Sequence, residues 1–564
     1  MCTIRNETIA KNFSLLSKLM EIHGENPFKT KSYANVVRTI DKYPTQLATM
    51  STHEIAAIKG VGDAIAQKIV DQIATGHLPL LDKYLAETPA GVVAMLQISG
   101  LGAKKVQTIW KDLGIETLGE LLYACDENRL RNYKGFGEKT QENIRQAIVF
   151  YQKSQGLFLY AQAAPIVQQT EVQLKAQFPG NSFFVCGKFR EQQEIVDQIE
   201  WVTDVDMSPL MAFAGKNNWL EKENKDNTVR FSTPENMQIL FRTFPKEQLA
   251  LQLFLHTGSA EFKEAWKTRF PASLALPLES EEQIFENAHT APIPAYLRDY
   301  PTIIEKAQNK DLPNVIQTRD IRGIIHSHST WSDGANTIRE MAGYVKENGM
   351  EYLVISDHSQ SAFYANGLNA ERLLHQHREI DQLNKELAPF HIFKSIESDI
   401  LYNGDLDYPG EVLDTFDLVI ASVHSILKMD EEKATQRVLA AVANPYTSIL
   451  GHMTGRLLLS RAGYPVDHEK VIKACAAHDV VIELNAHPRR LDIDWHWLRR
   501  ALECGITTSV NPDAHSTEGC KVVQYGVLVG QKAGLTARQN LSSYTLEEMF
   551  AFVEKQKAKR TRKP

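Results

Sequence analysis

Histidine and carboxylate side chains recur at the ends of short apolar runs in the second half of the chain, and no other feature constrains the fold as strongly. Gly323-Ile324-Ile325 precedes the first histidines, and Leu418-Val419-Ile420 lies shortly before a later one. The set contains six histidines and three acids: His326, His328, Asp333, His358, Glu397, His424, His452, Asp513 and His515.

These runs alternate with helical stretches, which predicts an α/β barrel whose strand ends converge on one mouth. A single histidine at a strand end is more often structural than catalytic. A whole set of imidazoles and carboxylates in the same context instead predicts a multinuclear site for transition metals.

Residues 320–545 resemble the PHP (polymerase and histidinol phosphatase) phosphoesterase family, whose nine metal ligands fall on these nine residues. The resemblance implies a distorted (β/α)7 barrel that holds three divalent ions, Mn²⁺, Zn²⁺ or Fe²⁺. By analogy, His326, His328, Glu397 and Asp513 hold one metal, and Glu397 is shared with a second. The same analogy assigns His424 and His452 to the second metal, and Asp333, His358 and His515 to third or bridging positions.

Further residues near the motifs are candidates for catalysis, substrate binding or support of the ligands. The resemblance makes Glu397, Asp513 and His515 catalytic as well as ligating. Arg456 and Arg461 are candidates for binding the substrate phosphate, because a guanidinium can contact phosphate oxygens bidentately; a surface or salt-bridged role is the alternative for Arg461. Asp357 precedes a ligand, and we expect it to cap a turn or support the ligand shell.

Length and composition bound the class of protein. A chain of 564 residues should form three or four domains, and 43% hydrophobic with 23% charged residues is typical of soluble proteins. The net charge of -7 argues against a broadly basic nucleic-acid binder, so any such contact is local. The cysteines show no CxxC spacing, and neither a signal peptide nor a spanning segment is visible. We expect a cytoplasmic monomer without membrane contact.

A Gly-x-Gly pattern recurs three times in residues 1–150, each time followed by a helical stretch that carries lysine. Paired glycines permit positive φ and close backbone approach, and the following helix N-terminus can bind a phosphate. The pattern resembles the helix-hairpin-helix motif, which grips the DNA backbone without reading sequence. Ordinary turns are the alternative. The candidate DNA-binding residues are Gly60, Gly62, Gly100, Gly102, Gly135 and Gly137.

The first 150 residues also resemble the lyase and fingers regions of family X DNA polymerases. Gly60-Val61-Gly62-Asp63-Ala64-Ile65-Ala66-Gln67-Lys68-Ile69 matches the lyase hairpin, and Lys68 falls at the Schiff-base lysine of that family. A surface lysine on an amphipathic helix is the alternative, because no base or other cause of a depressed pKa is visible nearby.

Residues 151–300 resemble the polymerase palm and thumb, but the catalytic pattern is degenerate. Gly187-Lys188 replaces the Gly-Ser of the family, Gln198 and Glu200 replace its paired aspartates, and Leu240 stands at the third carboxylate. Two-metal phosphoryl transfer needs those carboxylates, so we expect polymerisation to be lost. His256-Thr257-Gly258-Ser259 keeps the sugar-contacting turn, and Asp204 with Asp206 is a weaker replacement pair.

Together these features predict a multidomain chain: a lyase-like helical domain (1–85), a fingers-like domain (86–150), an α+β nucleotidyltransferase-like palm and thumb (151–300), a linker (301–319) and a PHP barrel (320–564). The leading function is a metal-dependent 3′→5′ DNA exonuclease in repair that acts on gapped DNA, single-stranded ends or abasic sites. It would also serve as an abasic-site endonuclease. The alternatives are a small-molecule phosphomonoesterase of the histidinol-phosphatase type and a non-catalytic DNA-binding scaffold.

Overall fold

The computed structural model describes residues 4–126, 130, 133, 135–154, 156–459 and 462–561, and the chain divides into two compact units. The first unit is Met1–Gln155 and the second is Gly156–Pro564. The expected lyase-like and fingers-like domains both fall within the first unit, and the palm, thumb and barrel all fall within the second. The division is therefore coarser than the one we expected from sequence.

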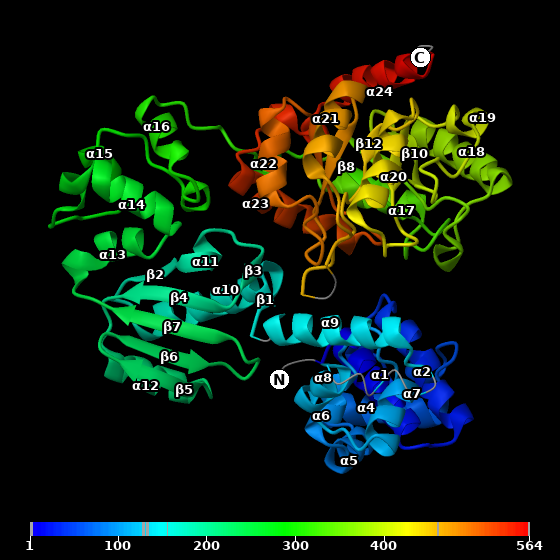
Figure 1. Ribbon diagram of the computed structural model, residues 1–564, viewed down its shortest axis with the longest axis horizontal. Helices are drawn as coiled ribbons and strands as arrows, with labels where there is room; N and C mark the ends of the chain where they lie inside the picture. Colours follow the sequence, from blue (N-terminus) through cyan, green and yellow to red (C-terminus); the bar gives the residue numbers. More distant parts are fainter. Residues whose placement is uncertain are drawn as a thin grey trace. The chain divides into compact units, whose positions relative to one another are not determined.

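The first unit is helical and has one core. Phe13 of α1, Ile69 of α4, Val106 of α7 and Ile144 of α9 are buried in the same hydrophobic cluster. This shared core explains why residues 1–85 and 86–150 do not separate into two bodies. The helices are α1 (Asn6–Ile22), α2 (Pro27–Asp41), α3 (Thr52–Ala56), α4 (Asp63–Thr75), α5 (Pro79–Glu87), α6 (Ala90–Met95), α7 (Ala103–Gln107), α8 (Leu118–Asp126) and α9 (Glu138–Ser154) (Figure 1).

Each Gly-x-Gly motif lies immediately before a helix. Gly60 and Gly100 have φ of 89° and 86°, and the second glycine of each motif is the N-cap of α4 or α7. A Cβ added at any of the four glycines would meet no atom within 4 Å, so the space beside each turn is open. The third motif precedes α9 with the same positive φ at Gly135, while its Lys134 lies outside the described residues.

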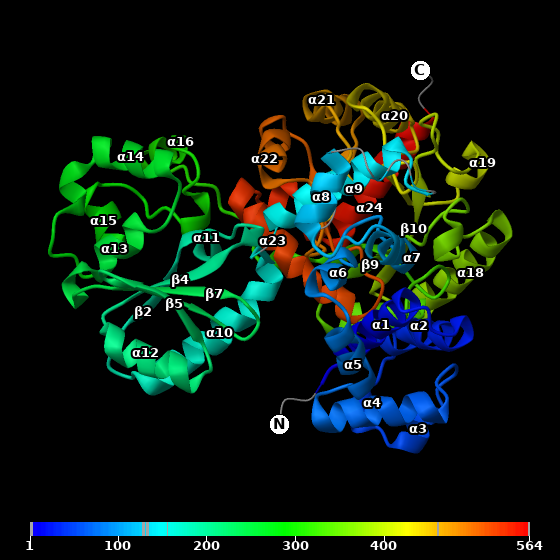
Figure 2. The same cartoon turned by 60° about the horizontal axis from the view of Figure 1, so that its bottom comes forward.

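The second unit begins with a mixed sheet of strand order β2-β4-β7-β6-β5. Helices α10 and α12 cover one face, where Trp201 and Phe241 are buried, and α13 covers the other (Figure 2). The elements are β1 (Phe158–Leu159), α10 (Tyr160–Gln177), β2 (Phe183–Cys186), α11 (Gly187–Arg190), β3 (Ile195–Val196), β4 (Gln198–Thr203), α12 (Met207–Lys216), β5 (Leu220–Lys225), β6 (Thr228–Ser232), β7 (Gln238–Thr243) and α13 (Leu249–Leu255).

The segment 301–319, which we expected to be a linker, is instead part of a folded helical layer. It contains α16 (Thr302–Gln308), whose Ile303 and Ile304 are buried in one cluster with Phe254 and Phe285. The prolines at its ends suggested an exposed connection, but the apolar side chains between them are used for packing. The neighbouring helices are α14 (Ala260–Arg269) and α15 (Glu282–Asn287).

A parallel seven-stranded sheet of order β14-β13-β12-β11-β10-β9-β8 forms the barrel. Backbone hydrogen bonds join its two edges, from His328 N to Ala514 O (2.8 Å) and from Ala514 N to His326 O (3.1 Å). The expected PHP-type (β/α)7 barrel is therefore confirmed. Its strands are β8 (Gly323–Ser327), β9 (Tyr352–Ile355), β10 (His391–Asp399), β11 (Leu418–Ser422), β12 (Ile449–Leu450), β13 (Val481–Asn485) and β14 (Thr508–Asn511).

The barrel strands are buried on both faces, as in parallel sheets covered by helices. Ile420 and Ile449 are buried in one hydrophobic cluster with Met549 and Phe552 of α24, the last helix of the chain (Figure 1). The helices are α17 (Ile338–Glu347), α18 (Ala370–Leu387), α19 (Gly410–Leu413), α20 (Glu431–Ala443), α21 (His468–His478), α22 (Trp495–Glu503), α23 (Val523–Ala533) and α24 (Leu546–Arg560).

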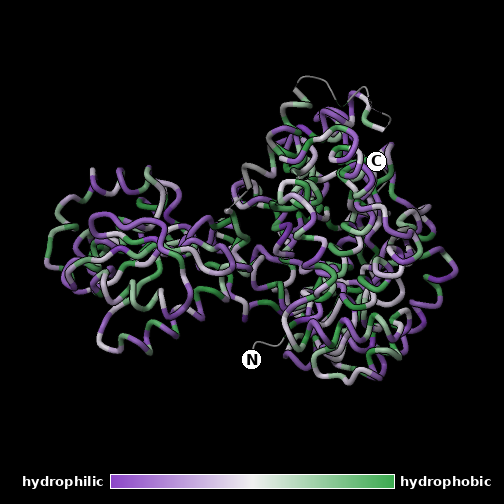
Figure 3. The backbone as a smooth tube through the Cα atoms, turned by 90° about the horizontal axis from the view of Figure 1, so that it is seen from below, coloured by the Kyte–Doolittle hydropathy of each residue, from purple (hydrophilic) through white to green (hydrophobic). Residues whose placement is uncertain are grey.

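Hydrophobic and hydrophilic stretches alternate over short distances along the chain (Figure 3). None of the helices in the described part of the chain is long and apolar enough to cross a membrane.

Candidate metal centre

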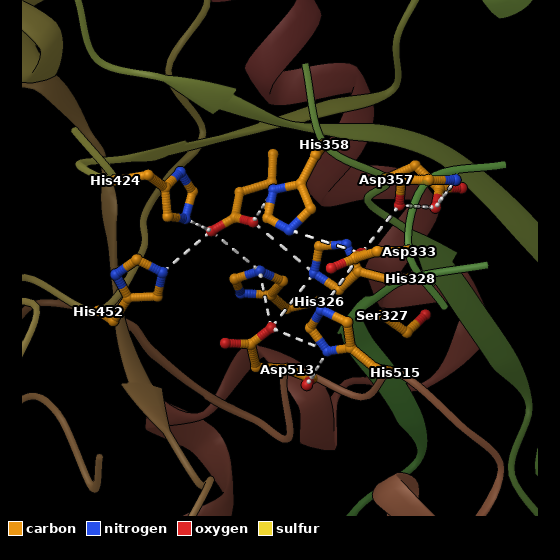
Figure 4. A network of polar contacts seen from close by, with 12 residues as sticks. His326, Ser327, His328, Asp333, Asp357, His358, His424, His452, Asp513 and His515 are labelled. Carbon is orange, nitrogen blue, oxygen red and sulfur yellow. Dashed lines mark hydrogen bonds and ion pairs between the residues drawn. The ribbon is translucent and has the colours of Figure 1, made fainter. Parts of the chain in front are cut away.

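Eight of the nine predicted residues lie at or just after the carboxyl ends of barrel strands, Asp333 lies in the loop after β8, and the side chains of all nine converge. Figure 4 shows His358, His424 and His452 on one side of the cluster and Asp513 with His515 on the other. The strands place them there because consecutive parallel strands end at the same mouth. The structure thus brings these nine predicted side chains together.

Glu397, at the carboxyl end of β10, is the centre of the cluster. One carboxylate oxygen, Oε1, lies 3.2 Å from His326 Nε2, 3.1 Å from His424 Nε2 and 3.0 Å from His452 Nε2. The other, Oε2, lies 3.0 Å from His358 Nδ1. A carboxylate between imidazoles on both sides has the arrangement that a bridging ligand requires.

Asp513 and Asp333 complete the cluster toward the mouth. Asp513 Oδ1 lies 3.2 Å from His328 Nε2 and 3.6 Å from His326 Nε2. Asp333 Oδ1 lies 3.4 Å from His515 Nε2. The side chains of His515 and Asp333 are 39% and 28% exposed, whereas His326 and His328 are fully buried, so the cluster is most open to solvent at His515 and Asp333.

Eight of the nine residues form three groups in which the ligand atoms all lie within 4.8 Å of one another, and His452 belongs to none of these groups. All three groups differ from the assignment made by analogy. Glu397 is absent from the group of His326 and Asp513, His358 takes the place of His452 beside Glu397, and His328 is common to two groups. The groups are His328, Asp333, His358 and His515; His326, His328 and Asp513; and His358, Glu397 and His424.

The chemistry of these atoms fits divalent metal ions. His326 Nε2, His328 Nε2 and Glu397 Oε2 are buried, and within the described part of the chain their contacts with the oppositely charged groups of the cluster lack the geometry of a regular hydrogen bond. Buried polar atoms without a regular hydrogen bond are rare in proteins. Imidazole nitrogens and carboxylate oxygens are also the ligands that Zn²⁺, Mn²⁺ and Fe²⁺ accept.

The charges of the cluster shift the pKa values of its members in opposite directions. Burial alone would lower the pKa of His424, but the Glu397 and Asp399 carboxylates outweigh it and raise the pKa to about 10. Burial would also lower the pKa of His515, but the Asp333 and Asp513 carboxylates outweigh it and raise the pKa to about 9. Burial would raise the pKa of Glu397, but the surrounding histidines hold it well below its usual range. Without metals, protons on the imidazoles therefore balance the acids.

Two ligating positions have strained backbones. His326 and Asp513 have φ of 61° and 53°, in the left-handed region that non-glycine residues rarely adopt. Such strain costs about 1–3 kcal/mol per residue and is concentrated at functional sites. The hydrogen bonds that Ala514 makes across the barrel closure hold both residues in this conformation.

Two acids missed by the sequence analysis support the histidines. Glu483 Oε2 accepts a hydrogen bond from His326 Nδ1 (2.6 Å), and Asp399 is hydrogen-bonded to His424 Nδ1. Acids in this position fix the tautomer and orientation of a ligating imidazole. Asp399 follows Glu397 by two residues on one strand, and Glu483 interrupts the apolar run of β13. Both positions could therefore have been recognised in the sequence as acids facing the site.

Asp357 has the capping role that we expected. Its buried carboxylate accepts hydrogen bonds from the backbone and side chain of Ser329 (2.7 Å each) and from Ser332 Oγ (2.5 Å). It thereby fixes the loop between His328 and Asp333 and lies outside the three donor groups.

Arg456 does not have the free guanidinium that we expected. Its Nη2 lies 2.7 Å from Glu194 Oε1, its Nη1 3.2 Å from Asp494 Oδ2, and its Nε donates to Arg490 O at 2.8 Å. Because protein oxygens already occupy these donors, the structure does not support Arg456 as the phosphate ligand. Arg461 lies outside the described residues.

Lys68 lies on α4, where its Nζ donates to the Ala64 carbonyl at 3.1 Å. This contact is typical of a lysine on a helix surface, and it favours the alternative to a Schiff-base role.

The degenerate palm residues lie on neighbouring strands, as the family pattern implies. Glu200 of β4 is opposite Leu240 of β7, and it pairs with Arg242 at 2.9 Å. Lys188 pairs with Asp197 at 3.0 Å. Arg242 and Lys188 therefore pair with the acids, and a buried leucine stands at the position of the third acid. Asp204 accepts a hydrogen bond from Ser182 N (2.8 Å), which does not suggest a replacement metal site.

Glu483→Gln is expected to lower the affinity for Mn²⁺ by about 10- to 100-fold, because loss of an acid behind a ligating histidine has this effect. Calorimetric titration of metal-free protein with Mn²⁺ measures it. Glu347→Gln, at an exposed acid that ends α17, is the matched control. Unchanged affinity in Glu483→Gln would show that His326 needs no support.

A parallel seven-stranded barrel with these residues at its mouth, preceded by helix-hairpin-helix motifs and a palm-like sheet, defines a PHP-containing relative of the family X DNA polymerases. Residues 4–78 match the helix-hairpin-helix domain family, and residues 92–148 match the SAM-like helix-hairpin-helix tandem family.

The DNA polymerase/3′-5′ exonuclease PolX of Bacillus subtilis is 30% identical over 572 residues, covering 98% of this chain and all of that protein. The chain belongs to the PolX family. A probable phosphatase of Thermoanaerobacter sp. is 28% identical over 222 residues, covering 37% of this chain and 86% of that protein. A probable phosphatase of Acetivibrio thermocellus is 31% identical over 166 residues, covering 29% of this chain and 64% of that protein.

Proposed function

We propose that this protein is a metal-dependent DNA phosphodiesterase that removes nucleotides in the 3′→5′ direction during DNA repair. The cluster of nine donors around Glu397 carries the proposal. The name of the Bacillus subtilis relative, which includes a 3′-5′ exonuclease, and the helix-hairpin-helix families add support.

The nine residues would hold up to three divalent ions, which when bound would acidify a water and neutralise phosphate charge. Glu483 and Asp399 orient two of the imidazoles, so His326 and His424 keep their Nε2 atoms directed at Glu397. His515 and Asp333 line the exposed side of the cluster, where a phosphodiester would enter.

The hairpins of the first unit are suited to holding DNA. Gly60, Gly62, Gly100 and Gly102 leave open space beside helix N-termini, where backbone amides can contact phosphates. We infer that gapped DNA, single-stranded ends or abasic sites bind there through the backbone.

Deleting residues 1–155 should weaken DNA cleavage by about 10-fold or more while leaving hydrolysis of a small chromogenic phosphodiester unchanged. A polymer gains affinity from remote backbone contacts, whereas a small substrate needs only the barrel. Comparing kcat/KM for both substrates measures the effect. Equal DNA cleavage by the truncated and full-length proteins would contradict a DNA-binding role for the hairpins.

Templated nucleotide addition should be absent, with primer extension at least about 1000-fold below the exonuclease rate. Gln198, Leu240 and the Glu200–Arg242 pair leave the palm without the acids that clamp two metal ions. Extension of a gapped primer by Glu397→Gln protein, in which hydrolysis cannot mask synthesis, is the measurement. Efficient extension would show that the palm is active.

A small-molecule phosphomonoesterase is the second candidate. The relatives named probable phosphatases match only the barrel part of the chain, and this observation favours it. A monoesterase has no need of the hairpin unit, which is why we rank it second.

Degradation of 5′-labelled DNA with Mn²⁺ tests the proposal. Single-stranded, gapped and abasic DNA should give a ladder that shortens from the 3′ end, and histidinol phosphate should be hydrolysed far more slowly. Rapid hydrolysis of histidinol phosphate with intact DNA would favour the phosphatase, and no hydrolysis of either would favour a scaffold.

A further inference from the structure

Arg490 is a cation beside the metal cluster that the sequence analysis did not consider. It lies in the loop between β13 and α22, its Nε is 3.6 Å from Asp513 Oδ2, and its side chain is 20% exposed. Among the described residues, Asp513 is the only acid with which it forms an ion pair. A guanidinium at the edge of an acidic site, with one side toward solvent, is suited to a phosphate oxygen.

The loop that carries Arg490 is held by Arg456. The guanidinium of Arg456 donates to the backbone carbonyls of Arg490 (2.8 Å) and Leu491. Thr454, two residues earlier, donates through its backbone and side chain to Asp492 at 3.0 Å each. The backbone beside Arg490 is therefore fixed by the segment that follows the ligand His452.

Arg456 is held in turn by the palm. Glu194, between α11 and β3, contacts its Nη2 at 2.7 Å, and the two side chains are only 10% and 16% exposed. Ile195 packs against the barrel core, and Gln192 Nε2 donates to Gln531 Oε1 of α23 at 3.1 Å. A carboxylate of the degenerate palm thus contacts the residue that shapes a loop of the metal site.

We propose that Arg490 binds the substrate phosphate at the metal centre and that Glu194, acting through Arg456, is a positioning residue for it. The inference rests on the proposed phosphodiesterase function. It gives the palm a role that does not depend on its lost carboxylates, namely to set the geometry of a loop in the adjacent barrel.

Arg490→Ala tests the phosphate contact. With metal content unchanged by elemental analysis, kcat/KM for DNA and for a small phosphodiester should both fall about 10- to 100-fold, the range expected for loss of a charge-assisted hydrogen bond. The dissociation constant of inorganic phosphate for the Mn²⁺-loaded protein should rise by a similar factor in calorimetry. Arg490→Lys should recover part of the loss, because it restores the charge but not the bidentate geometry.

Glu194→Gln tests the positioning role, since it keeps the shape of the side chain and leaves Asp494 to neutralise Arg456. We expect kcat/KM to fall about 5-fold alone but not further when Glu194→Gln is added to Arg490→Ala, because residues acting in one chain are not additive. Gln192→Asn, which disturbs the contact between the palm and α23 of the barrel, is the matched control. It should leave kcat/KM and the dissociation constant of phosphate unchanged.

The outcomes separate this inference from the proposed function. Normal phosphate binding and normal kcat/KM in Arg490→Ala, with activity still abolished in Glu397→Gln, would overturn the inference and leave the proposed function intact. Additive losses in the double variant, or an equal loss in Gln192→Asn, would overturn the role of Glu194. Absence of any phosphoester hydrolysis by the wild-type protein would overturn the proposed function and this inference with it.

Discussion

Glu397→Gln should reduce DNA hydrolysis by more than about 100-fold, a loss larger than the 10- to 100-fold typical of residues that only support a ligand. Glu397 places one carboxylate oxygen within 3.2 Å of three imidazoles and the other 3.0 Å from a fourth. Glutamine keeps the shape but replaces one oxygen with an amide nitrogen that cannot bind a metal ion.

The loss is measured by single-turnover cleavage of end-labelled DNA, with Glu347→Gln as control and with elemental analysis of both proteins. The folded state of the hairpin unit, followed by circular dichroism, should not change. Full activity in Glu397→Gln would mean that the cluster is not the catalytic site.

Removing the metals with a chelator should lower hydrolysis by more than about 1000-fold, because no ion would acidify the attacking water from a pKa near 16 toward 7. Activity should return with Mn²⁺. His424 and His515, with pKa values of about 10 and 9 in the metal-free protein, are protonated at neutral pH. Rebinding must displace these protons, so Mn²⁺ affinity should rise with pH.

The folding stability of the metal-free protein should fall as pH rises, whereas its affinity for Mn²⁺ should increase. A histidine whose pKa is raised in the folded state stabilises the fold below its unfolded pKa of about 6.5, and this contribution is lost as pH rises through about 9–10. Thermal unfolding with and without Mn²⁺ at increasing pH measures both effects. A midpoint of the metal-free protein that does not fall with pH would contradict the charge balance described for the cluster.

The barrel and the convergence of its donors could be predicted from sequence because most donors lie at or just after the end of a buried strand. Residues 418–420, for example, are apolar and fully buried, and the parallel register brings the end of this strand beside the end of the strand carrying Glu397. Strand periodicity and the convergence of parallel strands at one mouth were enough to predict that His326 and His515, which are 189 positions apart in the sequence, lie in one site.

The residues that hold the loops around the site could not be predicted in the same way. Arg456 follows a ligand in sequence, which suggested a substrate contact, but its direction depends on Glu194, 262 residues away. Arg490 follows no strand-end pattern, and only the fold of its loop brings it to Asp513. Likewise, the prolines of 301–319 predicted a linker. Local composition cannot show that Ile303 and Ile304 are buried in a hydrophobic cluster with residues distant in sequence.

Sulfur substitution at the scissile phosphate tests most directly whether DNA is cleaved at these metals. A DNA strand with one non-bridging oxygen replaced by sulfur should be cleaved slowly with Mn²⁺ and should recover with Cd²⁺, because soft ions prefer sulfur ligands. We expect this recovery in the wild-type protein and none in Glu397→Gln. An identical sulfur effect with both metals would contradict direct contact between the substrate phosphate and the metal centre.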